Sequence, residues 1–514
     1  MKKLIFIEKY LVPNRFYNFV FLFAFGLASF QSDDLAEKRI RKDITYNSFD
    51  SNEHLSLRDE QELVNFIESR LQINNIPGVS VAVVKDDRIV LEKYFGLSNI
   101  NQNISVNENT KFILSSVSKT VTATALMQLF EQGLFGLDDD INDYLSFRVI
   151  HPDHPQVPIT FKMLLTHTSG IKDNWSVMTY YDGDSTYELS SYVYDYFHPQ
   201  GILYNPNLNF NNSSPGTTFE YSNNAVALIG LLIEQLSGDS FNNYCRQNIF
   251  EPLDMNDTFW FLSEIENLSE VAHPYRWVSS SQNSCFEIGC GVYADNLPCY
   301  CDIDCASFAD CCFDYQSVCG ELGTGADPSN LVENNHYGYS DYPSGQLRST
   351  SRDLAKFMAT FLNSGVYNGT RILNNSTVEL MKTIQNPSIS TSQALMWYYK
   401  NELGRDLFGH NGGDVGSLTE MFMSFEDNIG VIVLTNTDHY SATIEIENAL
   451  FDFAETATFS SVGDINSDTL INIQDVILLV NLVLNQNYNN LADINLDQVI
   501  DILDVVQIVN IILN

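Results

Sequence analysis

A serine and a lysine three positions apart, Ser116 and Lys119, are the pair of residues with the clearest chemical potential. A serine hydroxyl is a weak nucleophile at neutral pH and needs a neighbouring base before it attacks a carbonyl carbon. A lysine that is partly withdrawn from water can lose its proton and act as that base. The pair therefore predicts acyl transfer through a covalent intermediate on Ser116.

The residues that follow are expected to form the helix that holds both side chains on one face. Residues 120–132 are mostly good helix formers, and Gly133 stands where a helix usually ends. Residues three apart share a helix face, and the amino terminus of a helix favours negative charge on a reacting oxygen. Taken alone, the pattern also fits a surface lysine on an amphipathic helix.

A series of short motifs runs through residues 60–455 in a fixed order. They are Ile76-Pro77-Gly78-Val79, residues 116–119, Leu137-Asp138-Asp139, residues 164–170, Tyr221-Ser222-Asn223, residues 252–255, residues 344–350 and His410-Asn411-Gly412. In this order they resemble the serine beta-lactamase and penicillin-binding-protein family, in the branch with class C beta-lactamases, D-alanyl-D-alanine carboxypeptidases, D-aminopeptidases and esterases. The resemblance implies an α+β fold for residues 57–455, with an antiparallel sheet flanked by helices and a helical subdomain.

The resemblance also implies which residues handle protons and substrate. Tyr221 would exchange protons with Ser116 and with the leaving group. Asn223 would hydrogen-bond the amide of the substrate and Lys119. His167 suggests a Ser-His-Asp triad as an alternative, but the family uses the loop that carries this histidine structurally.

The last motif, His410-Asn411-Gly412, departs from the Lys-Thr-Gly that is usual in the family. The resemblance implies that Gly412 lets the strand approach the substrate, and that the Gly413 N–H joins the Ser116 N–H in an oxyanion hole. Histidine removes the permanent cation that faces the carboxylate of a beta-lactam. The motif therefore favours peptidase or esterase activity over beta-lactamase activity.

Eight of the nine cysteines are clustered in a short segment: Cys285, Cys290, Cys299, Cys301, Cys305, Cys311, Cys312 and Cys319. A dense, even-numbered cluster in an exported chain predicts a disulfide framework. The spacing resembles a somatomedin B domain over residues 281–321, inserted within the hydrolase domain, where we expect it to shape substrate access. Zinc binding is the alternative, although the cluster lacks paired Cys-x2-Cys motifs.

The tail repeats a pattern of oxygen-bearing side chains. The first repeat has Asp464, Asn466, Asp468, Leu470, Asn472 and Asp475, and the second has Asp493, Asn495, Asp497, Val499, Asp501 and Asp504. These are the ligand positions of a calcium loop, with the leucine and the valine offering backbone carbonyls. An apolar helix is expected after each loop, over residues 476–484 and 505–513. The repeat resembles a type I dockerin over residues 461–514, which implies Ca²⁺ as a structural cofactor and a cohesin-like protein as partner. A solvated acidic tail is the alternative.

The amino terminus indicates where the protein acts, and the charge balance limits its partners. Basic residues precede an apolar run at 16–30, which predicts a signal peptide over residues 1–30, with an uncleaved anchor as the alternative, and a polar linker follows over 31–56. Acidic residues outnumber basic ones by 65 to 27, for a net charge of −38, which argues against nucleic acid as a partner.

Together these features predict a secreted or surface-held serine hydrolase that cleaves an amide or ester in a small peptide or ester substrate, with no cofactor for catalysis. Two other functions fit the sequence. One is a binding or assembly protein whose hydrolase site is unused, and the other is a true beta-lactamase.

Overall fold

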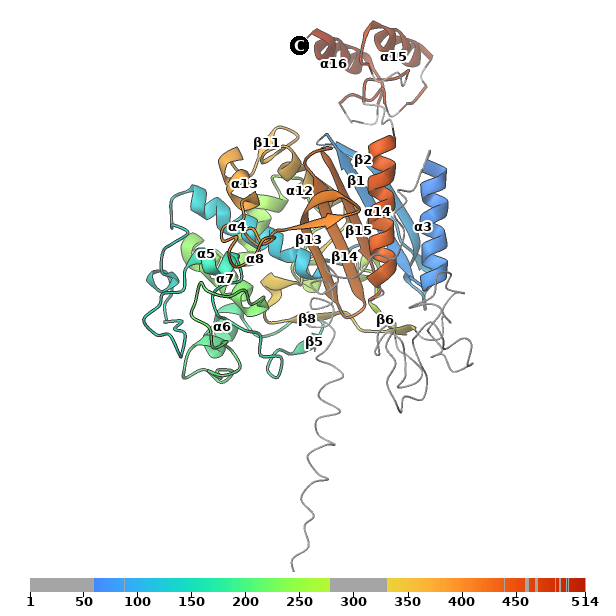
Figure 1. Ribbon diagram of the computed structural model, residues 1–514. Coiled ribbons are helices and arrows are strands. Elements are labelled where there is room, and N and C mark those ends of the chain that lie inside the picture. The colour runs from blue at the N-terminus through green and yellow to red at the C-terminus, as the bar shows by residue number, and fades with distance from the viewer. Residues whose placement is uncertain are drawn as a thin grey trace, which may run out of the picture. The chain divides into compact units, whose positions relative to one another are not determined.

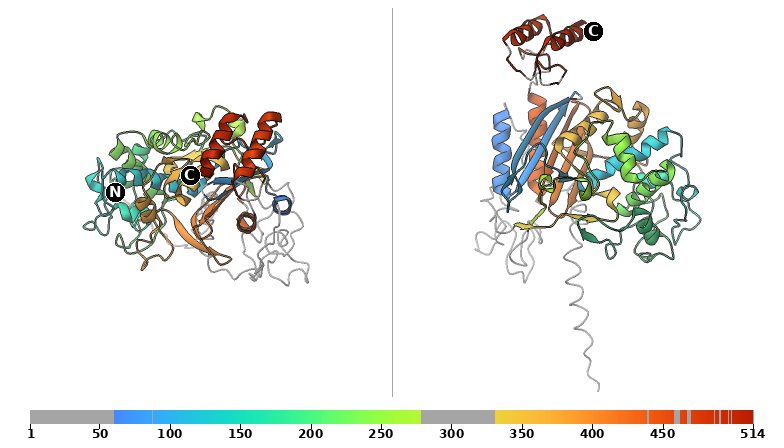
Figure 2. Two further views of the ribbon diagram at one scale, coloured as in Figure 1. Left: turned by 90° about the horizontal axis from the view of Figure 1, so that it is seen from above. Right: turned by 180° about the vertical axis from the view of Figure 1, so that it is seen from behind.

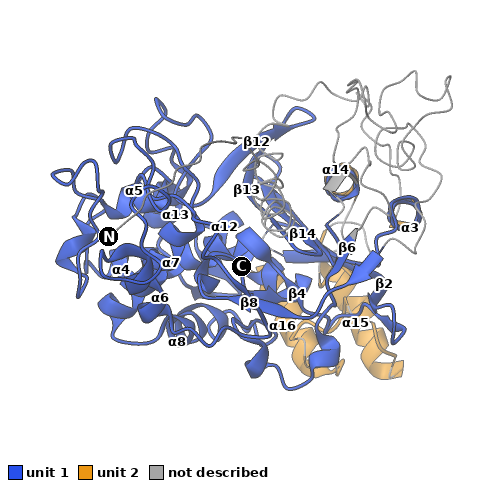
Figure 3. Ribbon diagram, turned by 90° about the horizontal axis from the view of Figure 1, so that it is seen from below, with its two compact units in different colours: residues 1–53, 66–448 blue, residues 54–65, 449–514 orange. Residues whose placement is uncertain are grey.

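The computed structural model describes residues 60–277 and 331–513, apart from 87, 439, 458–461, 467–469, 486, 490, 496 and 498. The expected signal peptide, linker and cysteine-rich insertion lie outside the described residues. The described chain divides into two compact units, one with residues 66–448 and the other with residues 54–65 and 449–514 (Figure 3). The first unit carries every residue predicted to take part in hydrolysis, and the second carries the tail repeats.

A seven-stranded antiparallel sheet is the centre of the first unit (Figure 1), as the sequence predicts. In spatial order its strands are β12 (Tyr398–Glu402), β13 (Arg405–Asp414), β14 (Ser417–Ser424), β15 (Ile429–Thr435), β1 (Gly78–Lys85), β2 (Arg88–Asn99) and β3 (Ile104–Ser105). The run of valines in β1 is buried on both faces, which suits a central strand. Because β1 pairs with β15, strands from the two ends of the unit form one sheet.

Short strand pairs connect the loops around this sheet. They are β4 (Phe112–Ile113) with β9 (Arg348–Ser349), β5 (Tyr180–Asp182) with β8 (Tyr337–Tyr339), β6 (Tyr275–Trp277) with β7 (Leu331–Glu333), and β10 (Val366–Tyr367) with β11 (Thr370–Arg371). In the third pair Trp277 lies opposite Leu331. The described residues that flank the segment with the cysteine cluster, Trp277 and Leu331, therefore lie side by side.

Helices cover both faces of the sheet and form a subdomain beside it. The subdomain has α4 (Ser118–Glu131), α5 (Phe161–Leu165), α6 (Leu189–Phe197), α7 (Asn223–Ser237) and α8 (Phe241–Cys245). Helix α12 (Ser351–Leu362) packs on one face of the sheet, and α13 (Asn375–Lys382) follows it. On the other face lie the parts of α3 (Glu60–Asn74) and α14 (Tyr440–Thr456) that belong to this unit (Figure 2). Because α4 is buried along most of its length, it is a core helix and not the amphipathic surface helix of the alternative interpretation.

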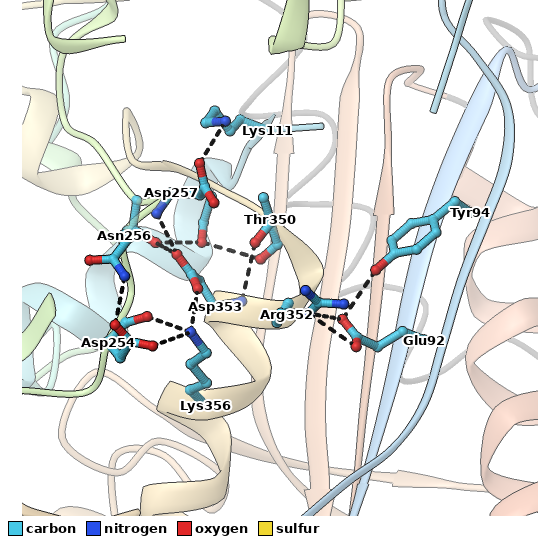
Figure 4. Close-up of polar contacts among 12 residues, drawn as sticks. Glu92, Tyr94, Lys111, Asp254, Asn256, Asp257, Thr350, Arg352, Asp353 and Lys356 are labelled. Carbon is cyan, nitrogen blue, oxygen red and sulfur yellow. Dashed lines mark hydrogen bonds and ion pairs between the residues drawn. The ribbon is translucent and has the colours of Figure 1, made fainter. Parts of the chain in front are cut away.

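Ion pairs and hydrogen bonds join the start of α12 to distant segments (Figure 4). The Arg352 guanidinium pairs with Glu92 of β2, with 3.0 Å between Nε and Oε1. The Asp353 carboxylate accepts the Asp257 N–H at 2.7 Å, and the Asp257 carboxylate pairs with the buried Lys111 ammonium at 2.8 Å. The network ties the sheet, α12 and the loop around Asp257 together.

Three ionisable side chains are buried together between β12, β14 and α14. The Lys400 Nζ lies 2.6 Å from Glu447 Oε2 and 3.6 Å from Glu420 Oε2, and both carboxylates are almost fully buried. Burial raises the pKa of Glu420 to about 8; Lys400 opposes the shift and Glu447 adds to it. Burial opposes the charge on Lys400, but the two carboxylates raise its pKa above the usual value.

This cluster predicts that the first unit loses stability as the pH rises. The folded chain holds the Glu420 proton more tightly than the unfolded chain, whose glutamates titrate near 4.5. The free energy of unfolding should therefore fall between about pH 4.5 and about pH 8. Glu420→Gln should reduce this loss, which denaturant unfolding of both proteins at pH 5 and pH 8 would measure. Equal pH slopes in the two proteins would contradict the prediction.

The second unit contains two helices, α15 (Ile473–Asn485) and α16 (Ile502–Leu513). Its core is formed by Leu479 of α15, Ile508 of α16 and Ala492 from the loop between them. Both helices begin three residues before the predicted starts, because the last residues of each acidic loop already form the first helical turn. Among the described residues, none of the helices combines the length and apolar character that crossing a membrane requires.

Candidate active site

Two proton-carrying groups meet at the Ser116 hydroxyl. Ser116 lies in the short 3-10 turn Ser115–Val117 that leads into α4, and it is 7% exposed. The fully buried Lys119 donates from Nζ to Ser116 Oγ at 2.9 Å and to the Ser344 carbonyl at 2.7 Å. The Tyr221 hydroxyl also donates to Ser116 Oγ at 2.9 Å. This is the arrangement that activates a serine nucleophile.

A buried carboxylate, which the sequence analysis does not identify, holds the Tyr221 segment in place. Asp173 accepts the Ser222 hydroxyl at 2.9 Å, the Asn223 N–H at 2.8 Å and the Asn224 N–H at 3.0 Å. These groups lie at the start of α7, where a negative charge is favourable. Because Asp173 lies about fifty residues before the motif it organises, no local pattern in the sequence points to it.

His167 lies behind Tyr221. Its Nδ1 accepts the Ser222 N–H at 3.3 Å, and its ring centroid is 4.4 Å from that of Tyr221. The Glu220 N–H donates to the His167 carbonyl at 2.7 Å. These contacts support the tyrosine segment, in keeping with a structural use of the loop.

A cleft opens beside the serine. It is lined by Ser115, Ser116, Trp175, Met178, Thr179, Tyr180, Asn223, Tyr339, Asp341, Ser344, Gly345, Gly413 and Asp414. The structure thus brings together Ser116, Asn223 and Gly413 of the predicted set. His410 and Gly412 are not among these lining residues.

His410 and Gly412 both lie on β13, the strand that passes the serine turn. His410 is 5% exposed, its Nδ1 lies beside the Asn411 carbonyl, and its ring is 5.3 Å from that of Tyr398. A Cβ on Gly412 would lie 2.4 Å from the Leu114 carbonyl oxygen. The glycine therefore lets β13 approach the turn that carries Ser116.

Gly412→Ala should push β13 away from the serine turn, because the added carbon would overlap backbone that cannot yield. We expect kcat/KM on an activated ester to fall by about 100-fold, as misplacement by about 1 Å does elsewhere. Asn411→Ala, one residue earlier on the same strand, is the control and should have a smaller effect. Equal activity of Gly412→Ala and the unmodified chain would contradict the close-approach role.

In both acidic loops, buried aspartate side chains accept hydrogen bonds from backbone N–H groups of the same loop. Asp464, Asp475, Asp493 and Asp504 are at most 1% exposed. Asp475 accepts the N–H groups of Ile465, Asn466 and Asn472 at 2.8, 3.1 and 3.0 Å, and Asp504 accepts those of Ile494, Asn495 and Asp501 at 2.7, 3.3 and 2.9 Å.

The other predicted calcium ligands are placed as follows. The Asp493 carboxylate accepts the Asp497 N–H at 3.1 Å, and the side chains of Leu470 and Val499 are exposed. Asp468 lies outside the described residues. In the part of the chain that the structure describes, no three His, Cys, Asp or Glu side chains gather as a metal site would gather them. The side chains predicted as ligands carry oxygen atoms, which are the ligand atoms that Ca²⁺ prefers.

The similarity to known proteins falls largely within the first unit. The Beta-lactamase family model matches residues 63–451. Penicillin-binding protein 4 of Amycolatopsis lactamdurans is 24% identical over 71% of this chain and 81% of its own length. Protein flp of Staphylococcus aureus is 28% identical over 39% of this chain. The matched part spans 38% of that relative's own length.

Solved structures share the fold. A D-amino acid amidase from Ochrobactrum anthropi, in complex with D-phenylalanine, has a TM-score of 0.55 and 19% identity over 76% of this chain and 98% of its own. The octameric penicillin-binding protein homologue from Pyrococcus abyssi has a TM-score of 0.53 and 24% identity over 77% of both chains. With the family model matching most of its length, the chain belongs to the beta-lactamase and penicillin-binding-protein-like family of serine hydrolases.

Proposed function

We propose that this protein hydrolyses an amide or ester bond in a small peptide or ester through an acyl-enzyme formed on Ser116. The observation that carries the proposal is the pair of 2.9 Å hydrogen bonds that Ser116 Oγ receives from Lys119 Nζ and Tyr221 OH. One such contact is common in folded proteins, but two proton carriers on a single hydroxyl beside a cleft have a direct use in acyl transfer.

The proposed reaction needs no cofactor. As Oγ attacks the substrate carbonyl carbon, the Ser116 proton passes to the neutral amine of Lys119, and the N–H groups of Ser116 and Gly413 stabilise the resulting oxyanion. The Tyr221 hydroxyl then protonates the leaving amine or alcohol and recovers a proton from Lys119, while Asn223 orients the substrate amide. A water molecule attacks the ester on Ser116, which restores the hydroxyl and releases the acid.

Covalent labelling tests this proposal. A fluorophosphonate probe, and a penicillin probe beside it, should label the full chain but not the Ser116→Ala variant. Labelling that survives in Ser116→Ala would place the nucleophile elsewhere. Absence of labelling in both proteins would favour the binding or assembly function, with the hydrolase fold kept as a scaffold.

Peptidase or esterase activity is favoured over beta-lactamase activity because β13 carries His410 in place of the family's usual lysine. The solved relative named a D-amino acid amidase supports D-amino-acid-containing peptides as a class to test. Turnover of a coloured cephalosporin at rates that match those on esters would reverse this preference.

The proposed accessory modules would act outside the cell. The signal peptide over 1–30 supports secretion or attachment to the cell surface, and the cysteine spacing supports a disulfide-bonded somatomedin B-like insertion over 281–321. The duplicated loops support a dockerin-like module over 461–514 that binds Ca²⁺ and a cohesin-like protein.

Calcium should stabilise the second unit. Four buried aspartates lie in a tail without lysine or arginine, so a bound cation would offset their repulsion. With Ca²⁺ at about 1,000 times its dissociation constant, binding would add about 4 kcal/mol of stability. Chelation should therefore lower the unfolding temperature of this unit in the full chain, measured by differential scanning calorimetry. In an Asp475→Ala, Asp504→Ala double variant the chelator should have little effect, whereas an unchanged chelator response would contradict the site.

A further inference from the structure

Two carboxylates line the cleft beside Ser116. They belong to Asp341 and Asp414, and the other lining residues are neutral: serine, threonine, asparagine, glycine, methionine and aromatic side chains. No lysine or arginine is among the described residues that line it. Burial raises the pKa of Asp341 to about 7, so its charge is only partly present at neutral pH, and the negative charge on the wall rests mainly on Asp414.

Two cationic side chains close to this wall, Lys119 and Arg348, already donate hydrogen bonds to other groups of the protein. Lys119 donates to Ser116 Oγ and to the Ser344 carbonyl, within the catalytic cluster. Arg348 is 2% exposed, and its guanidinium donates to the carbonyl oxygens of Gln346 and Tyr337 behind the wall. Neither side chain is among the residues that line the cleft, where a substrate carboxylate would have to be bound.

Asp414 is held in a fixed orientation. It is the last residue of β13 and directly follows Gly413, whose N–H is proposed for the oxyanion hole. Its Oδ1 accepts the Tyr180 hydroxyl at 2.8 Å and the Val415 N–H at 2.7 Å. A carboxylate fixed in this way needs little reorganisation when it binds a charged group.

Aromatic residues line the same cleft as this carboxylate. Trp175, Tyr180 and Tyr339 also line the cleft, and the centroids of the two tyrosine rings are 5.7 Å apart. Aromatic faces attract ammonium and guanidinium groups, most strongly where water is partly excluded. Carboxylate and rings together suit an organic cation.

We propose that this cleft has a subsite for a positively charged group of the substrate, with Asp414 as the residue that selects it. The inference rests on the proposed function and narrows it to amides or esters that carry a free amino group or a cationic side chain. Substrates with a carboxylate in this position would be rejected by repulsion.

Binding of three ligands that share a phenethyl group tests the subsite without turnover. The ligands are phenethylammonium, 2-phenylethanol and 3-phenylpropanoate, each titrated into the full chain in a calorimeter. Because a charge-assisted hydrogen bond would be gained, the ammonium ligand should bind about 10-fold tighter than the alcohol, and the carboxylate should bind least. Asp414→Asn should remove this preference. Tyr180→Phe, which keeps the carboxylate and loses one of its donors, should retain it.

The outcomes separate this inference from the proposed function. Equal binding of the three ligands, tighter binding of the carboxylate, no binding of any of them, or a preference that survives in Asp414→Asn would each overturn the subsite. Ammonium selectivity in a chain whose Ser116 takes no fluorophosphonate would uphold the subsite and count against hydrolysis. For an active chain, the ratio of kcat/KM for an aminoacyl p-nitroanilide to that for its N-acetyl form should fall about 10- to 100-fold in Asp414→Asn.

Discussion

Lys119→Met is expected to lower kcat/KM on an activated ester by about 10²- to 10⁴-fold, the usual range for loss of a positioned general base. Methionine is close to lysine in length and suits a buried helix position, but it takes no proton from Ser116. The loss should appear as a slower fluorophosphonate reaction at Ser116, measured as a second-order rate constant. Circular dichroism and the unfolding midpoint would show whether α4 stays folded.

Tyr221→Phe is the matched variant for this test. It removes the second hydrogen bond to Ser116 Oγ while the ring stays available to pack against His167. If Lys119 is the main base, the tyrosine variant should keep more of the acylation rate than the lysine variant. A Lys119→Met chain that reacts as fast as the unmodified chain would transfer the role of base to Tyr221.

Lys400→Met is expected to have the largest effect on stability. It removes the cation that lies 2.6 Å from Glu447 and 3.6 Å from Glu420, and it leaves carboxylates buried without it. Breaking a buried ion pair from one side costs about 3–5 kcal/mol. Denaturant unfolding at pH 7 should show this loss.

Two controls make this result specific. Lys382→Met breaks a pair with Glu379, whose side chain is 57% exposed, and should cost at most about 1 kcal/mol. Adding Glu420→Gln and Glu447→Gln to Lys400→Met should recover much of the loss, because no buried charge then lacks a partner. A cost for Lys400→Met as small as that for Lys382→Met would contradict the account of the cluster.

The fold of the first unit could be predicted well because its signals are local or ordered along the chain. The helix that follows Ser116 is where its helix-forming residues place it, and the antiparallel sheet agrees with the resemblance. The meeting of Lys119 and Tyr221 at Ser116 Oγ is the arrangement that the motif order suggests. Their catalytic roles stay predictions until acylation is measured.

Other features depend on contacts between residues far apart in the sequence. Asp173 caps a helix fifty residues away, and Lys400 meets its carboxylates across two strands and a helix. Asp414 shares a wall with Asp341 only because β13 ends beside the loop after β8. No spacing rule brings such groups together before the sheet is built, so the charge of the cleft could not be predicted from the sequence.

The pairing of β6 with β7 bears on the segment that separates these strands in the sequence. Trp277 and Leu331 are cross-strand partners, so a two-residue turn could join them and leave the hydrolase complete. The entropy cost of closing a loop rises by only about 0.6 kcal/mol for each doubling of its length, so this strand pair tolerates connecting segments of very different length. The β6–β7 pair is thus a position in the fold where the connecting segment can be exchanged, in evolution or by engineering, without changing the strands on either side of it.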